Sequence, residues 1–376
     1  MSQGWKHGTV DDFCHVQYGT RVVRKRDQGS TYPVYGGGGA TFAMDIFNRE
    51  DRVIISRFGM SEWCTRFVPG RFFLNDSGLT LSPRNPRELL PQYLDMWALA
   101  MNDEIYALGK GAAQKNLDAS AFRSLRLSHP ADISEQQRIV LLLDEAFVGV
   151  ATAKANAEKN LRYARALFAS HLQSVFSQRG EGWVERRIGD ACTLKSGTSV
   201  GAALERSIGE LPYLKVADMT HAGNEVEIVS SSRFLNRGDV RRNAIFPPGT
   251  TVFPKRGGSI MTNKKRLTAV PICADLNIMG VIPGEGLLPR FLYFYFLNVD
   301  MRQLGGGSSI PQINNYDIAP LAISAPESVD VQADIVRELQ HLSADTQLLG
   351  SIYQRKLDAL EELKKSLLHQ AFSGGL

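Results

Sequence analysis

The chain has 376 residues, a length that predicts two or three domains. Its 43% hydrophobic and 22% charged residues are typical of a folded protein and exclude a disordered or collagen-like chain. The net charge of +4 is too small to identify a nucleic-acid-binding protein by itself.

The beginning of the chain lacks the basic and apolar series of a secretory signal, and no apolar run reaches the roughly 20 residues of a membrane helix. We therefore expect a cytoplasmic protein without a membrane partner. The four cysteines stand far apart without a CxxC pair, which argues against a zinc module or a disulfide framework. Cys14 and Cys192 align in an internal repeat described below, and we expect both in the core.

Residues 1–130 are rich in glycine and β-branched residues and predict an α+β domain with short strands, such as 53–56. A glycine run begins at Gly36 and Gly37, but no GxGxxG or GxxxxGK[ST] pattern of a phosphate cradle follows. The run is either a flexible loop that lets the backbone approach DNA or a surface turn. The basic run from Arg21 to Arg26 is either a phosphate contact or a solvated surface.

Residues 131–180 predict one long amphipathic helix, since apolar residues recur every three or four positions from Ile139 to Phe176. The segment follows Pro130, and Ser134 with Gln137 predicts a capping box at its start.

Residues 181–326 repeat the first domain. Positions 5–20 align without a gap on 183–198, an offset of 178, and 90–94 align on 288–292, an offset of 198. We also align Gln114 and Asn116 with Gln312 and Asn314 at the offset of 198. A segment at 250–253 predicts a strand, and the other basic clusters are 241–242 and 264–266.

Residues 327–376 repeat the long helix at an offset of 196. Both helices far exceed the ~11 or 12 residues of an ordinary globular helix. Their apolar seams are of equal length, so we expect them to pack antiparallel as a two-stranded coiled coil.

Catalytic motifs do not stand out along the chain. The closest match to the D/N-P-P-Y/F loop of an adenine methyltransferase, residues 246–249, lacks both the polar head and the aromatic tail. The sequence has no GxSxG nucleophile elbow and no HExxH pair. We therefore expect neither a catalytic nor a metal site in this chain.

The order of domain, helix, domain and helix resembles the specificity subunit of type I restriction-modification systems. Three short segments carry the resemblance together with the repeat: 32–37 (YPVYGG), 111–117 (GAAQKNL) and 135–140 (EQQRIV). The second copy departs at 308–314 (SSIPQIN), which stands where the first has 110–116.

The resemblance implies two target recognition domains, 1–130 and 181–326, which each read one half of a split, asymmetric site in double-stranded DNA. It implies that the helical spacers, 131–180 and 327–376, set the distance between the halves and dock two modification subunits. Those partners methylate adenine with S-adenosylmethionine, and the family's complexes can include restriction subunits that use ATP and magnesium. The resemblance therefore implies no cofactor in this chain itself.

Basic and amide side chains in each domain are the candidate DNA contacts, because phosphates attract cations and base edges need hydrogen-bonding groups. For the first domain they are Arg24, Lys25, Gly36, Gly37, Arg57, Lys110, Gln114, Lys115 and Asn116. For the second they are Lys255, Arg256, Lys264, Lys265, Gln312 and Asn314.

The paired amides recur in both copies although the two domains read different sequences, which favours a backbone or structural role over base reading. Base readers should lie where the copies diverge, at 36–80 and 199–270, and Arg57 is a candidate for guanine. Shape readout of the DNA is the alternative.

Two other classes compete with this interpretation. One is a stand-alone DNA-binding or scaffold protein without a methyltransferase partner, and the other is an enzyme whose site lies between the two domains. A neighbouring methyltransferase gene would favour the specificity subunit over both.

Overall fold

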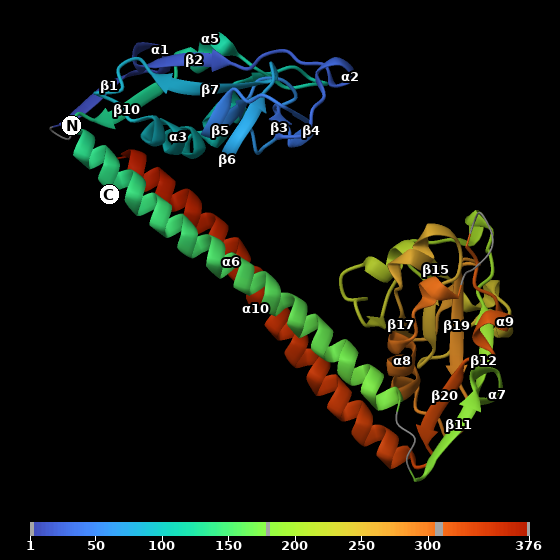
Figure 1. Ribbon diagram of the computed structural model, residues 1–376. Helices are drawn as coiled ribbons and strands as arrows, with labels where there is room; N and C mark the ends of the chain where they lie inside the picture. Colours follow the sequence, from blue (N-terminus) through green and yellow to red (C-terminus); the bar gives the residue numbers. More distant parts are fainter. Residues whose placement is uncertain (1–3, 178–180, 305–310, 374–376) are drawn as a thin grey trace. The chain divides into compact units, whose positions relative to one another are not determined.

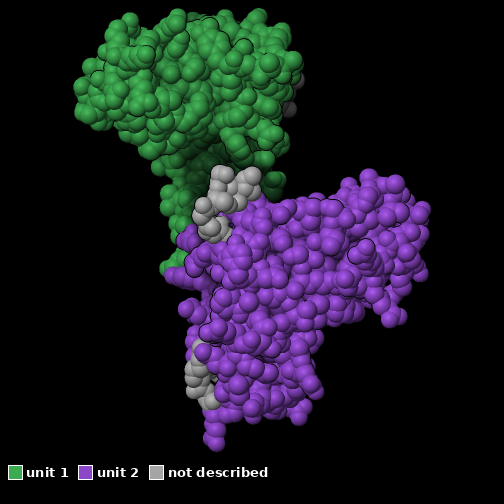
Figure 2. All heavy atoms as spheres, turned by 90° about the vertical axis from the view of Figure 1, so that its right-hand side faces the viewer, with its two compact units in different colours: residues 1–159, 353–376 green, residues 160–352 purple. Residues whose placement is uncertain are grey.

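A computed structural model describes residues 4–177, 181–304 and 311–373 of the chain. The chain forms two compact units (Figure 2). One consists of Met1–Lys159 with Tyr353–Leu376, and the other consists of Asn160–Ile352. We call them unit 1 and unit 2 and describe each by itself.

Unit 1 contains a six-stranded sheet in the order β2-β7-β5-β6-β3-β4, antiparallel except for the pair β3 and β6 (Figure 1). In this order the strands span Cys14–Tyr18, Gly78–Pro83, Arg49–Ser56, Thr65–Leu74, Tyr32–Tyr35 and Ala40–Met44. The apolar residues of β5 predict a buried strand, and Val53 and Ile55 share one core with Tyr93 and Trp97 of helix α3, Pro91–Ala100.

The smaller elements of unit 1 surround this sheet. Strand β1, Trp5–Thr9, pairs antiparallel with β10, Arg126–Pro130, and β8, Gly109–Lys110, pairs with β9, Asn116–Leu117. The short helices are α1 (Val10–Phe13), α2 (Arg24–Asp27), α4 (Asn102–Ala107) and α5 (Ala119–Arg123).

Unit 2 repeats this plan with two sheets, in the orders β12-β19-β16-β17-β14 and β15-β13-β18. The strands of the first span Cys192–Ser196, Ile278–Pro283, Thr251–Pro254, Arg266–Thr268 and Glu227–Ile228, and those of the second span Phe234–Leu235, Leu211–Leu214 and Cys273–Ala274. Strand β11, Trp183–Arg187, pairs with β20, Ala322–Pro326. The α-helices are α7 (Ile188–Ala191), α8 (Pro289–Asn298) and α9 (Asn315–Ile318).

Short 3₁₀ helices fill the loops of unit 2. They span Ala202–Leu204, Val216–Thr220, Arg237–Asp239, Arg242–Ala244, Gly257–Thr262 and Met301–Gln303. Unit 2 therefore uses more irregular backbone than unit 1 in the region where the two sequences diverge.

The repeat predicted from the sequence is confirmed in the strand register. Trp5 lies opposite Pro130 in unit 1, and Trp183 lies opposite Pro326 in unit 2. Gly19 and its counterpart Gly197 are equally constrained, because a Cβ atom there would come within 1.9 Å of the Asn75 carbonyl oxygen or 2.1 Å of the Asp275 carbonyl oxygen.

All four cysteines are buried and free, which confirms the core positions expected for Cys14 and Cys192. Burial raises the pKa of the Cys14 thiol to about 12, and those of Cys64 and Cys192 to about 11. The pKa of Cys273 is raised for the same reason. These thiols act as small apolar side chains.

The two long helices are α6, Ile133–Phe176, and α10, Val329–Ser373, and they confirm the predicted amphipathic helices. Within unit 1, Leu143 of α6 and Leu368 of α10 share one core, and an ion pair joins Lys154 to Glu361. Within unit 2, Leu172 of α6 packs in one core with Leu339 of α10. The helices thus pair antiparallel in each unit, as the sequence predicts (Figure 1).

A buried glutamine ties the start of each long helix to its domain. The side chain of Gln136 accepts a hydrogen bond from the Leu90 N–H (2.9 Å) and donates one to the Pro130 carbonyl (2.8 Å). Gln332 does the same with the Leu288 N–H (2.9 Å) and the Pro326 carbonyl (2.7 Å). These bonds satisfy backbone groups that burial would otherwise leave without partners.

The capping box predicted at Ser134 and Gln137 is wrong. Helix α6 begins at Ile133, and the Asp132 carboxylate accepts hydrogen bonds from the Ser134 N–H (2.9 Å) and hydroxyl (2.7 Å). A carboxylate at this position satisfies a free N–H of the first turn and also interacts favourably with the helix dipole.

Candidate nucleic-acid interface

Arg57 follows the last residue of β5 and lies between two partly exposed aromatic rings. Its guanidinium carbon is 4.7 Å from the centre of the Tyr18 ring and 4.6 Å from that of Phe58. Both rings attract the cation through their π faces. No carboxylate pairs with Arg57 in the part of the chain that the structure describes.

The turn from Arg57 to Met60 is held by the segment that contains Gln114, Lys115 and Asn116. The Leu117 N–H donates to the Arg57 carbonyl (2.9 Å), and the Met60 N–H donates to the Lys115 carbonyl (2.8 Å). The Asn116 side chain accepts from the Gly59 N–H (3.2 Å). Gln114 is exposed beside this turn, so the structure brings these predicted residues together around Arg57.

The other predicted cations of the first domain are on the surface. Lys110 forms an ion pair with Asp118 (2.5 Å), and the Lys115 ammonium lies 3.5 Å from the centre of the Tyr106 ring. Arg24 and Lys25 are exposed on α2. These positions are accessible to a phosphate backbone.

The DNA contacts predicted at Gly36 and Gly37, in a flexible loop, are wrong, because both glycines are buried. The Gly37 N–H donates to the Ser77 hydroxyl (3.1 Å), and its carbonyl accepts from the Ser56 hydroxyl (2.7 Å). A Cβ atom on Gly37 would come within 2.8 Å of the Phe58 carbonyl oxygen. The glycines therefore permit close packing beneath the Arg57 turn.

Unit 2 builds the same junction from other residues. The Ile313 N–H donates to the Lys255 carbonyl (2.8 Å), and the Gly257 N–H donates to the Pro311 carbonyl (2.8 Å). Arg256 is exposed, and its Nε donates to the Gln312 side chain (3.2 Å). Residues 308–310 of the divergent segment lie outside the described residues.

The hydrogen bonds also correct the alignment of the paired amides. Leu117 bonds to Arg57 as Ile313 bonds to Lys255, an offset of 196 rather than 198 for the bonding segment. Asn116 therefore corresponds to Gln312, and Asn314 corresponds to Asp118, since each precedes the first residue of a short helix. The stretch between α8 and this segment is therefore two residues shorter than the stretch between α3 and its counterpart in unit 1. A comparison of residue types alone did not locate this deletion.

Two predicted phosphate contacts of the second domain are wrong, because their side chains are buried. The Lys265 ammonium donates to the Asn263 side chain (2.7 Å) and the Val299 carbonyl (2.7 Å), and burial lowers its pKa to about 8. The Lys255 ammonium donates to the Ser196 hydroxyl (2.8 Å), and burial lowers its pKa too. Lys264 is partly exposed and remains a candidate.

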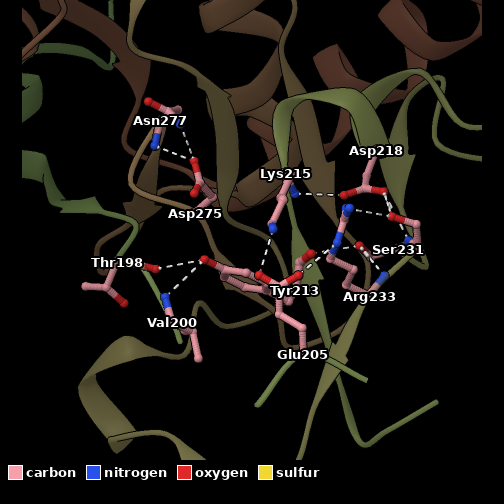
Figure 3. A network of polar contacts seen from close by, with 11 residues as sticks. Thr198, Val200, Glu205, Tyr213, Lys215, Asp218, Ser231, Arg233, Asp275 and Asn277 are labelled. Carbon is pink, nitrogen blue, oxygen red and sulfur yellow. Dashed lines mark hydrogen bonds and ion pairs between the residues drawn. The ribbon is translucent and has the colours of Figure 1, made fainter. Parts of the chain in front are cut away.

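A polar network in unit 2 neutralises further cations (Figure 3). Glu205 pairs with both Lys215 (2.7 Å) and Arg233 (2.8 Å). Beside it, the Tyr213 hydroxyl donates to the Thr198 carbonyl (3.3 Å). These contacts give the network a structural role, and Lys215 and Arg233 are less available to phosphates than the exposed Arg256.

Sequence reasoning missed the aromatic residues of the candidate interface, Tyr18 and Phe58, which are 38% and 39% exposed. A signal was present, since Phe58 follows Arg57 directly and exposed aromatic side chains beside cations are typical of interfaces. Arg241, which belongs to the basic cluster 241–242, lines an open cavity of about 460 Å³ with Asn243 and Thr198.

The family described as the type I restriction modification DNA specificity domain matches residues 2–152 and 180–355. No curated protein matches the chain. Two solved structures are similar to it over nearly their whole length, both at 16% identity. At this identity the likeness shows the fold alone.

The first comes from work described as the structural basis underlying complex assembly and conformational transition of the type I R-M system. Its TM-score is 0.80, and the match covers 100% of this chain and 99% of the other. The second is the HsdS subunit from Thermoanaerobacter tengcongensis, with a TM-score of 0.61 and coverage of 100% and 98%. Among the described residues, no helix is long and apolar enough to cross a membrane.

Proposed function

The chain belongs to the type I restriction-modification DNA specificity family, and from this premise we propose that its two recognition domains each read one half of a bipartite, asymmetric DNA target. The chain selects the site without catalysing a reaction. Two partner modification subunits, which bind S-adenosylmethionine, methylate adenine in the halves. Restriction subunits, which use ATP and magnesium, join the same complex.

One observation carries this proposal. Each domain places an arginine at the same backbone junction, the partly exposed Arg57 in the first and the exposed Arg256, one register position further on, in the second, while the residues around them differ between the copies. A shared scaffold with different exposed side chains fits two domains that read different sequences, because base edges are distinguished by side chains and not by the backbone.

The long helices support the docking of the modification subunits. Each carries large apolar side chains that stay exposed beside the seam, an arrangement typical of a protein-binding surface. On α6 these include Leu141 (69% exposed) and Val148 (68%), and on α10 Leu348 (58%) and Leu363 (47%).

Methylation-sensitive long-read sequencing of host DNA tests the function, with this gene present or deleted and the modification subunit left intact. We expect a split motif with methyladenine in each half, which is lost on deletion. Replacing residues 1–130 by another recognition domain should change one half only. An unchanged methylome in cells that express the system would support the stand-alone DNA-binding or scaffold protein instead.

The docking surface needs a separate test. Truncation before Glu327 would also remove Leu368 and Ala371 from the core of unit 1, so surface variants are sharper. We expect the double variant Leu141→Glu and Val148→Glu to abolish co-purification with the modification subunit. The control is the double variant Ile46→Glu and Ile208→Glu, which places the same two charges on exposed positions of the recognition domains. Normal assembly of the double variant would contradict the proposed surface.

A further inference from the structure

We infer that Arg57 reads a guanine in the half-site of the first domain, with its guanidinium oriented by the rings of Tyr18 and Phe58. The inference rests on the proposed function and adds the base and the side chain that recognises it. It is carried by the position of the guanidinium, the fixed backbone beneath it and the contrast with the second domain.

The guanidinium is free to bind a base and is already oriented. The Tyr18 and Phe58 ring centres lie 4.7 and 4.6 Å from its central carbon, so both rings hold the cation. A contact with a ring face leaves the N–H groups at the edge of the guanidinium plane available for acceptors. None of them is used by a carboxylate among the described residues.

The backbone that carries Arg57 is fixed on both sides. Its N–H donates to the Ser77 carbonyl (2.8 Å), and its carbonyl accepts from the Leu117 N–H (2.9 Å). Gly59 turns the chain with a φ of +59°, a conformation that favours glycine. A side chain on such a support loses little freedom when it binds, which favours specific recognition.

Guanine is the base that matches this group. In the major groove it presents two acceptors, N7 and O6, side by side, and an arginine can donate to both at once. Adenine offers a donor beside its N7, so the second N–H of the fork would have no acceptor there. A bidentate contact gives a preference of about 5- to 150-fold for guanine over the wrong base.

The second domain shows that the fold does not require an arginine at the position of Arg57. Lys255 occupies the register position of Arg57, and Ser196 occupies that of Tyr18, yet the Lys255 ammonium is buried and donates to Ser196. The scaffold therefore accepts different side chains here. A position that varies on a fixed scaffold is suited to set which base each domain accepts.

The experiment compares methylomes of cells that carry the complete system with the parent chain, Arg57→Ala or Arg57→Lys. We expect both variants to lose the preference for guanine at one position of the first half-site, by about 5-fold or more, while the second half stays unchanged. Lysine keeps the charge but not the fork, so its loss separates base reading from phosphate attraction.

The matched control is Arg24→Ala, which removes an exposed cation of the same domain. It should lower methylation equally at all sites and leave the motif intact. Co-purification of each variant with the modification subunit checks folding and assembly. If Arg57→Ala assembles and lowers methylation without changing any motif position, Arg57 contacts phosphate and the inference is wrong. If the parent chain yields no split motif, the proposed function itself fails.

Discussion

Arg57 and Lys255 occupy one register position in the two recognition domains, but their side chains have opposite environments. Arg57 is partly exposed between Tyr18 and Phe58, whereas Lys255 is buried against Ser196. The backbone hydrogen bonds around them are the same in kind. The comparison teaches that the scaffold is kept by main-chain bonds, while the side chains at this junction differ between the two recognition surfaces.

The interiors of the domains differ as well, and in charge. The first domain buries Asp95 of α3, which forms an ion pair with Arg52 (2.9 Å). At the corresponding position of α8 the second domain buries Tyr293, and elsewhere it buries Lys265. The first domain thus buries a carboxylate at a position where the second has a tyrosine, and the second buries Lys265 in addition to a carboxylate of its own, Asp218. The following variants should separate the contributions of Asp95 and Lys265.

The largest effect is expected from Arg52→Met. It leaves the buried Asp95 carboxylate without its cation, so the free energy of unfolding of the first domain should fall by about 3–5 kcal/mol. Amide hydrogen exchange, resolved by domain in increasing urea, measures the loss. The second domain should not change, and an equal loss in both would show that they unfold as one unit.

The pH dependence of the first domain should depend on Asp95. Burial raises its pKa from 3.8 to about 6, although Arg52 opposes the shift. The folded state therefore binds more protons between pH 4 and 6, and this group lowers stability as pH rises through that window, by about 3 kcal/mol. Subtracting the unfolding curves of Asp95→Asn from those of the parent isolates the effect. A difference that does not vary with pH would contradict it.

The second domain should respond to pH in the opposite direction through Lys265. Burial lowers its pKa from 10.5 to about 8, so the unfolded state binds more protons between these values. Stability from this group therefore rises as pH increases from 8 to 10.5, by about 3 kcal/mol. We expect Lys265→Met to remove the rise, measured by the same exchange experiment at alkaline pH. Persistence of the rise in the variant would assign it to another group.

The smallest effect tests what the domains share. Gln136→Ala and Gln332→Ala each remove a buried side chain that bonds to the N–H of the residue before α3 or α8. Each variant should destabilise its own domain by about 1–3 kcal/mol, and by similar amounts, because the two sets of bonds match. Thermal unfolding of both variants checks this. If only one variant lowered the stability of its domain, the two glutamines would make the same hydrogen bonds but contribute differently to the free energy of unfolding.

Much of the fold could be predicted from the sequence because it depends on periodic features. The apolar spacing of α6 and α10 and the repeated Trp5 and Trp183 are visible in the residues themselves, and the structure confirms them. The strands predicted at 53–56 and 250–253 lie in or overlap β5 and β16. Such patterns reflect burial of one face of an element, which the residue types record directly.

The candidate site was harder to predict, because residue type does not show which way a long side chain points. Lys265 looks like a surface cation, but two nearby acceptors, from Asn263 and Val299, compensate for its burial. Gly36 and Gly37 look like a loop, but their lack of a Cβ serves close packing. Gln312 was aligned with Gln114 instead of Asn116 because the matching segments are short. A two-residue difference in loop length cannot be detected from so few matching residues.

The buried cysteines have a practical consequence for spectroscopy. A thiol reacts with maleimides and iodoacetamides as its thiolate, and the raised pKa values of Cys14, Cys64, Cys192 and Cys273 leave little of that form near neutral pH. A cysteine introduced at an exposed position, as in Arg24→Cys or Arg237→Cys, should therefore be labelled selectively without removing the native ones. A double variant with both cysteines can be labelled with a donor and an acceptor dye. Energy transfer between the two dyes would then report how the domains move when DNA is added.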